Sequence, residues 1–240
     1  MDVLLAVLWA DDDAGAPPDA DALRANVSRA LAGPLAELGV TEVVVNVRDR
    51  LVEGALIDVR VTPRPFAAAV RVRVPVASAT ACAGILDALA GLGPVSAWSV
   101  TASEPLPPPA PGPDGRCDGM ANLALLRRPE WIGRAEWLRR WLEDHTPVAV
   151  ATQSTSAYTQ HVVVRALTDD APAIEGVVEE VFPLGAVRDL GVFFDAAGDD
   201  TRLAANVAAM TASTGRFLDD GAVDAIPTGR YVMRVPGPDV

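Results

Sequence analysis

The chain has 240 residues, half of them hydrophobic, and a formal net charge of −12. This length suits one or two packed domains, and the acidity disfavours nucleic acid and anionic membranes as partners because both select basic patches. All 20 basic residues are arginine, which excludes chemistry that needs a lysine amine, such as Schiff-base formation, pyridoxal-phosphate attachment and P-loop phosphate binding.

The start of the chain predicts a strand rather than a signal peptide. Residues 2–9 are apolar, no basic residue precedes them, and Asp11, Asp12 and Asp13 follow at once. No apolar run approaches the ~20 residues needed to cross a bilayer. Cys82 and Cys117 are far apart and outside any CxxC motif, so we expect free thiols. These features favour a cytoplasmic protein without membrane contact.

The first half, residues 1–104, shows the periodicities of a β-α-β-β-α-β unit. Helical spacing of leucine and valine alternates with short runs of β-branched residues. The expected strands are residues 2–9, 41–47, 68–76 and 95–103, and the expected helices are residues 20–38 and 78–92.

Residues 105–118, PLPPPAPGPDGRCD, predict an extended linker, because six prolines and two glycines oppose both a helix and a central strand. The second half, residues 119–240, then repeats the pattern of the first. Its expected strands are residues 120–126, 158–167, 174–182 and 231–234, and its expected helices are residues 134–152, with a break or kink at Pro147, and 201–218.

Two β-α-β-β-α-β units predict an α+β protein made of two tandem ferredoxin-like halves. Each sheet has an apolar face that must be covered. We expect the two sheets to face each other as an intramolecular dimeric α/β-barrel, with a lumen between them.

The helix 134–152 contains the first candidate site residues. Trp137, Trp141 and His145 are four residues apart and so share one face. His145 in the lumen could act as a general acid or base, since its ordinary pKa of about 6.5 suits that role. The alternative is structural, with two tryptophans anchoring the helix and His145 favoured by the helix dipole.

The strand 158–167 adds further candidates. Alternation places Tyr158 and Gln160 on one face and Thr159, His161 and Arg165 on the other. Tyr158 and Gln160 in the lumen would be convergent polar groups of a pocket, although Tyr158 could equally be a core residue. For His161 we expect a position at the surface or rim.

The strand 174–182 brings Glu179 and Glu180, which as neighbours must face opposite sides. One of them can enter the lumen, where burial would raise its pKa and suit it to acid–base chemistry. A solvated position, or an ion pair with Arg127 or Arg165, is the alternative. The two histidines with a few carboxylates could form a metal site only if the fold brings them together, and their spacing does not show it, so we expect neither metal nor cofactor.

The second half resembles the EthD family of dimeric α/β-barrel proteins. The resemblance rests on the segment from Trp141 to Pro147, on Tyr158 to His161, and on Glu175-Gly176 running to Phe182. The family's second motif is typically Tyr-x-Gln-Asn, so His161 departs from it. The resemblance implies an α/β barrel with an apolar lumen and covers about half of the chain.

The resemblance also implies chemistry on aromatic or polyketide-like molecules, by dehydration, decarboxylation or cofactor-free oxidation. On this basis we expect a cofactor-independent enzyme of lyase, dehydratase or decarboxylase type, acting on a small hydrophobic or aromatic molecule. The expected catalytic residues are His145, Tyr158 and Glu180, and the expected substrate-binding residues are Trp137, Trp141, Gln160, His161 and Glu179.

Two other functions stay open at this level. The same pocket could bind a ligand without reaction, in an accessory protein. A haem-binding barrel enzyme would need one histidine as axial ligand, for which the sequence has no motif. The substrate is not defined by the sequence, and a homodimer is compatible with it.

Overall fold

The computed structural model describes residues 1–10 and 19–234, so the acidic residues Asp11 to Asp13 lie outside the described part. The first half contains β1 (Asp2–Trp9), α1 (Ala20–Glu37), β2 (Glu42–Val47), β3 (Phe66–Val74), α2 (Ala83–Ala90) and β4 (Val95–Leu106). The second half contains β5 (Met120–Leu126), α3 (Arg134–Arg139), the π-helical η1 (Arg140–His145), α4 (Thr146–Thr152), β6 (Ala157–Ala166), β7 (Gly176–Phe182), the short 3-10 helix η2 (Leu184–Val187), α5 (Leu190–Phe193), α6 (Asp200–Thr214) and β8 (Val223–Arg234).

The strands form one closed antiparallel barrel in the order β1-β3-β2-β8-β5-β7-β6-β4. Two seams join the halves, where β2 pairs with β8 and β4 pairs with β6. Val45 lies opposite Tyr231 in the first seam, and Ala102 lies opposite His161 in the second. The predicted α+β class and the intramolecular barrel are therefore confirmed.

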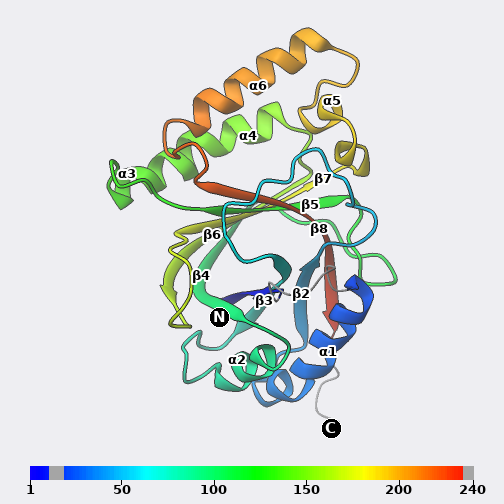
Figure 1. The fold of residues 1–240 in the computed structure, drawn as a ribbon, viewed down its shortest axis with the longest axis vertical. Coiled ribbons are helices and arrows are strands. Elements are labelled where there is room, and N and C mark those ends of the chain that lie inside the picture. Colours follow the sequence, from blue (N-terminus) through cyan, green and yellow to red (C-terminus); the bar gives the residue numbers. More distant parts are fainter. Residues whose placement is uncertain (11–18, 235–240) are drawn as a thin grey trace.

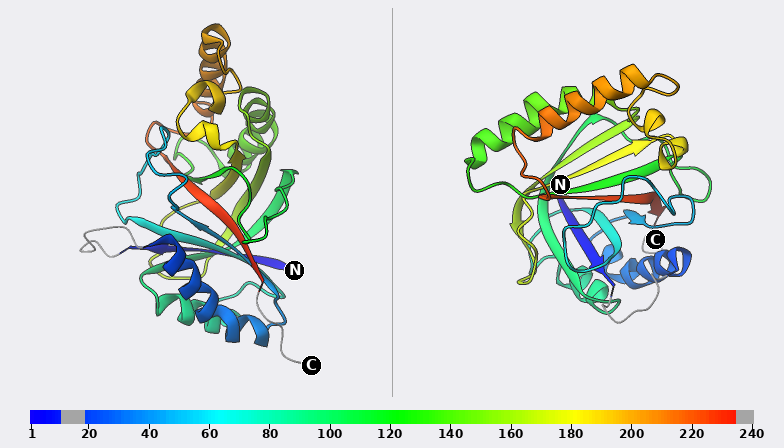
Figure 2. Two further views of the ribbon diagram at one scale, coloured as in Figure 1. Left: turned by 90° about the vertical axis from the view of Figure 1, so that its right-hand side faces the viewer. Right: turned by 45° about the horizontal axis from the view of Figure 1, so that its top comes forward.

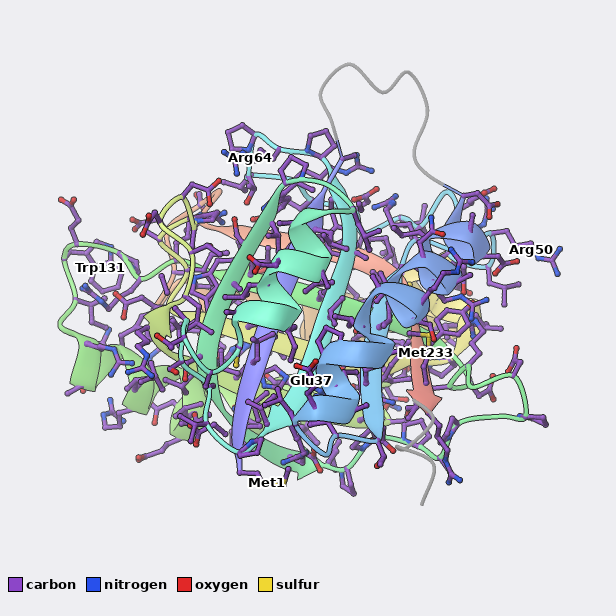
Figure 3. All side chains as sticks on the ribbon, turned by 90° about the horizontal axis from the view of Figure 1, so that it is seen from below. Met1, Glu37, Arg50, Arg64, Trp131 and Met233 are labelled. Carbon is purple, nitrogen blue, oxygen red and sulfur yellow. The ribbon has the colours of Figure 1, made fainter. Side chains whose placement is uncertain are left out.

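Helices cover the barrel on two opposite sides (Figure 1). Helices α1 and α2 pack on the first half, whose outward side chains, such as Leu4, Val45 and Val70, form a core with Leu31 and Leu35 of α1. Figure 3 shows both helices across this face, with Met1 and Arg64 at opposite ends of the strands. The helices α3 to α4 and α6 form the layer over the second half (Figures 1 and 2).

The barrel interior is filled rather than hollow over most of its length. Side chains of both halves meet there, including Leu5, Trp98 and Leu123. An eight-stranded barrel is just wide enough for its own side chains to fill. The expected apolar lumen is therefore not continuous between the sheets, because side chains fill this stretch of the interior.

The helix from Arg134 to Thr152 is continuous but changes its winding. The six residues Arg140–His145 form a π-helical stretch, which ends directly before α4. Pro147 lies at the first positions of α4, where a missing backbone N–H is tolerated. The predicted irregularity at Pro147 is therefore found just before the proline, where the helix changes to π-helical winding without breaking.

The last strand is the main error in the predicted elements. It runs from Val223 to Arg234 and not only over residues 231–234. Pro227 and Gly229 lie inside it, and both residue types ordinarily oppose a strand assignment. The strand tolerates them because its partner changes here: residues 223–228 pair with β5 and residues 229–234 pair with β2, so Pro227 is in register with β5 alone.

The proline-rich segment between the halves lies against the barrel. Strand β4 continues to Leu106, so the segment starts later than predicted. A bridge pairs Arg116 with Tyr231, and the Nε of Arg116 is 2.8 Å from Oδ2 of Asp49. Among residues 1–10 and 19–234, none of the helices is both long and apolar enough to cross a membrane.

Candidate functional site

A cavity of about 210 Å³ lies between the outer face of the second half's strands and the helix layer. Strands β5 to β8 form its floor, and η1, α5 and α6 form its walls. Helix α6 is barely packed, since Ser213 is its only buried residue. Helix α6 contributes Met210 and Thr214 to the cavity wall, and Figure 2 shows the helix in the layer over the second half.

A row of three polar side chains crosses the cavity floor. Asn122 of β5 pairs in register with Glu180 of β7, and Glu180 pairs with Tyr158 of β6. Register partners share one face of a sheet. All three side chains are buried and line the cavity.

Glu180 has an unusual environment for a carboxylic acid. It is buried, its Oε1 has no hydrogen-bond partner among the described residues, and no cation pairs with it there. Burial raises the pKa of Glu180 to about 8. The group therefore keeps its proton at neutral pH and can donate it. Burial, and then the neighbouring Glu180, raise the pKa of the Tyr158 hydroxyl, which stays a neutral donor.

Three further atoms in the cavity wall lack partners within the described ranges. They are Oδ1 of Asn122, Oε1 of Gln153 and Nε1 of Trp141. Buried polar atoms are nearly always hydrogen-bonded, so these atoms are available to bind the polar groups of a ligand. Together with Glu180 they give this apolar cavity both donors and acceptors.

The tryptophans of the helix pack as a pair on the sheet, as their spacing indicates. The ring centroids of Trp137 and Trp141 are 5.1 Å apart, and both side chains are fully buried. Gly176 makes room for them, since a Cβ there would lie 2.5 Å from the Trp141 ring. Trp141 lines the cavity, whereas Trp137 lies behind it against Phe217.

His145 faces the helix layer and not the barrel interior, which corrects the predicted lumen position. Its Nδ1 is 2.9 Å from Oγ of Ser213, and its ring lies 4.8 Å from that of Phe217. Burial lowers the pKa of His145 to about 4, so the ring is neutral at pH 7. It lines the same cavity as Glu180.

Tyr158 and Gln160 share one face, as predicted, but that face is the helix side. Gln160 does not line the cavity. Its Nε2 donates to Oγ1 of Thr146 over 2.6 Å, and its Oε1 accepts from Oγ of Ser103 over 3.0 Å. The amide therefore ties β6 to α4 and β4, and its atoms are occupied.

His161 and Glu179 point into the barrel, away from the cavity. The expected rim position of His161 is wrong, because the side chain is 1% exposed. Its Nε2 is 3.2 Å from Nη1 of Arg71. Glu179 pairs with Arg71 at 3.4 Å and with Arg230 at 3.2 Å, and not with Arg127 or Arg165. The eight predicted site residues therefore lie on two faces of the barrel wall: His161 and Glu179 face the interior, and the other six face the helices.

Asn122 and Gln153 also line the cavity, and neither was predicted from the sequence. Asn122 is the only polar residue in the strand MANLALL, a signal that could have been used. Gln153 follows α4 directly and has no such signal. Within residues 1–10 and 19–234, His, Cys, Asp and Glu do not gather in groups of three or more that could hold a metal ion.

Comparisons with known proteins relate the chain to other proteins by fold alone. No family model and no curated protein sequence matches it. A crystal structure of an anthrone oxidase-like protein aligns over 100% of this chain and 97% of that chain, with a TM-score of 0.57 and 10% identity.

Two crystal structures of proposed monooxygenases also align along the chain. The one from Fusobacterium nucleatum covers 100% of this chain and 96% of its own, at 8% identity and a TM-score of 0.49. The one from Lactobacillus acidophilus covers 98% and 99%, at 7% identity and a TM-score of 0.46. The anthrone oxidase-like structure supports the α+β barrel fold, and at such identities it says nothing about the reaction.

Proposed function

We propose that the chain binds a small apolar carbonyl compound in the cavity of its second half and catalyses proton transfer on it without a cofactor. The observation that carries this proposal is the buried carboxyl group of Glu180, whose Oε1 has no hydrogen-bond partner among the described residues, in a largely apolar cavity beside Asn122 and Tyr158. A carboxylic acid that keeps its proton at pH 7 is a general acid.

In this proposal Glu180 and His145 act as a pair. We assign to His145 the tautomer protonated at Nδ1, which lies 2.9 Å from Oγ of Ser213, so that the lone pair of Nε2 is left for the ligand. Glu180 gives its proton to the carbonyl oxygen while Nε2 accepts a proton from the adjacent carbon. The product is an enol, and loss of a β-hydroxyl group as water would make the reaction a dehydration. Tyr158 and Asn122 orient the oxygen.

The cavity volume limits the ligand. About 210 Å³ is below the roughly 300–1,000 Å³ of sites for drug-sized molecules, so a ligand of one or two rings fits best. The walls supplied by Trp141, Phe193 and Phe217 favour an aromatic body. An aromatic ligand agrees with the chemistry implied by the EthD resemblance. We include in this proposal that the chain is an EthD-like protein built of two tandem ferredoxin-like halves.

Deuterium exchange tests the proposal without knowledge of the natural substrate. We would incubate 2-tetralone, a small aromatic ketone, with the protein in D2O and follow loss of its α-proton signals by NMR. The wild type should accelerate exchange, and Glu180→Gln should remove at least nine-tenths of the acceleration. Glu104→Gln, at an exposed ion pair with Arg73, is the matched control.

Each outcome has a defined meaning. Equal exchange by the wild type and Glu180→Gln would overturn the role of Glu180. Saturable binding of 2-tetralone without exchange would overturn catalysis and leave a ligand-binding accessory protein.

A further inference from the structure

A second group of buried polar residues lies at one end of the barrel, away from the cavity under the helices. At this end β2 begins and β3 and β8 end, and Met1 marks it in Figure 3. A separate cavity of about 250 Å³ opens there. Its walls include Arg71, Arg73 and Arg230, together with the apolar side chains of Val40 and Val44.

The charges in the buried part of this site do not balance. Arg71 and Arg230, whose side chains are 12% and 4% exposed, both face the single carboxylate of Glu179. His161 is neutral, because burial lowers its pKa to about 3. The buried set therefore carries one net positive charge, which is costly without a counter-anion.

The surrounding carboxylates do not remove this excess. Glu104 also lines this cavity, and its charge acts on Arg71, but it is 32% exposed and lies 3.2 Å from Arg73, so solvent screens it and its ion pair is with the outer arginine. Glu42 lines the opening, but it is an exposed residue at the start of β2. Asn46 donates to Glu179 over 2.9 Å and brings no charge.

Donor groups are left over in the same place. Arg71 uses Nη1 toward His161 and Glu179. The Nε of Arg230 lies 3.2 Å from Oε1 of Glu179 but makes no hydrogen bond among the described residues. Arg230 directs Nη1 to Sγ of Cys117 at 2.9 Å. The Nδ1 of His161, nearly fully buried, has no partner in the described ranges. Two arginine forks around an anion match the two oxygens of a planar carboxylate.

We propose that the end of the barrel is a binding site for a small organic monocarboxylate. Its carboxylate lies between the guanidinium groups of Arg71 and Arg230, and its apolar body lies against Val40 and Val44. This site is independent of Glu180 and of the proposed proton-transfer reaction.

Calorimetric titration of the full chain with benzoate tests this site, in a buffer free of other carboxylates and of phosphate. Benzoate should bind saturably with a stoichiometry of one, and neutral benzamide, of nearly the same shape, should bind at least tenfold more weakly. Arg71→Gln keeps the Arg230–Glu179 pair and should weaken benzoate at least tenfold. Arg64→Gln, at an exposed ion pair with Asp170, should bind benzoate like the wild type.

Four results would overturn the assignment. The first three are no saturable binding of benzoate, equal affinity for benzoate and benzamide, and unchanged affinity in a folded Arg71→Gln variant. The fourth is tighter binding of inorganic phosphate than of benzoate. The benzamide comparison uses the wild type, so it decides the matter even if Arg71→Gln does not fold.

Discussion

Glu179 and Glu180 are neighbours on β7, and their carboxyl groups lie on opposite faces of the barrel wall in opposite protonation states. Glu179 is held by Arg71, Arg230 and Asn46, and these partners lower its pKa against the effect of burial. Glu180 has no cationic partner in the part of the chain that the structure describes, and burial raises its pKa to about 8. One strand thus carries a structural anion and a neutral acid in consecutive positions.

Removing the charge of Glu179 should destabilise the protein strongly. Glu179→Gln leaves two buried guanidinium groups without a carboxylate, and such losses cost about 3–5 kcal/mol. Glu104→Gln breaks an exposed ion pair and should cost less than about 1 kcal/mol. Urea unfolding at pH 7 measures both values, and similar costs for the two variants would contradict the assignment of Glu179.

Glu180 should make the stability fall as pH rises. The unfolded chain loses the Glu180 proton near pH 4.5, whereas the native protein keeps it to about pH 8. Between these values the native state binds more protons, so the free energy of unfolding falls by up to about 1.4 kcal/mol per pH unit from this group.

The Glu180→Gln variant isolates that contribution. Its stability relative to the wild type should increase steadily from pH 5 to pH 8, as measured by urea unfolding at several pH values. A constant difference over this range would show that Glu180 titrates normally.

Both histidines should remain neutral in the native protein at pH 5.5. Burial lowers the pKa of His145 to about 4, and burial with the nearby Arg71 lowers that of His161 to about 3. Imidazole signals in NMR spectra should therefore stay constant between pH 8 and pH 5.5. Because the unfolded chain takes up these protons near pH 6.5, stability should decline as pH falls below that value. A midpoint near 6.5 for either ring would refute its burial.

Gly176 should be intolerant of a side chain. Its φ is not positive, so the backbone accepts alanine, but the new Cβ would lie 2.5 Å from the Trp141 ring and 3.1 Å from that of Trp137. Overpacking of this kind costs about 1–3 kcal/mol. Gly133→Ala meets nothing within 4 Å and should have a much smaller effect. Thermal unfolding of the two variants compares them directly, and equal melting temperatures would argue against the tryptophan packing.

Filling the cavity should block ligand binding without unfolding the protein. Ala124 lies on its floor, and Ala124→Phe places a ring into the space of about 210 Å³. We expect at least a tenfold loss of affinity for 2-tetralone, measured by quenching of tryptophan fluorescence. Ala205→Phe, on the exposed side of α6, should retain binding. Undiminished binding by Ala124→Phe would place the ligand elsewhere.

The sequence predicted which side chains share a face but not what each face meets. The alternation on β6 correctly separated Tyr158 and Gln160 from His161. Both faces of β1 and β7 are buried, however, so polarity does not mark the barrel interior. Which face of β6 points into the barrel depends on how β6 pairs with β4. The paired residues, such as Ala102 and His161, are far apart in the chain.

The separation of the site residues was beyond the sequence for the same reason. The partners of Glu179 come from β2, β3 and β8, and no local spacing relates Arg71 to Arg230. The face shared by Trp137, Trp141 and His145, by contrast, follows from helical spacing, and all three are buried as expected.

The two seams also determine how the halves depend on each other. Each half ends its set of strands in two edges, and both edges are paired only by the other half, through β2 with β8 and β4 with β6. Cleavage near Gly112 would therefore give two fragments, each with two unpaired edge strands. These edge strands regain their hydrogen-bonded partners only when both fragments are present. Co-expression of residues 1–112 and 113–240 should reconstitute the barrel, which makes the chain a candidate split protein for reporting the proximity of two fused partners.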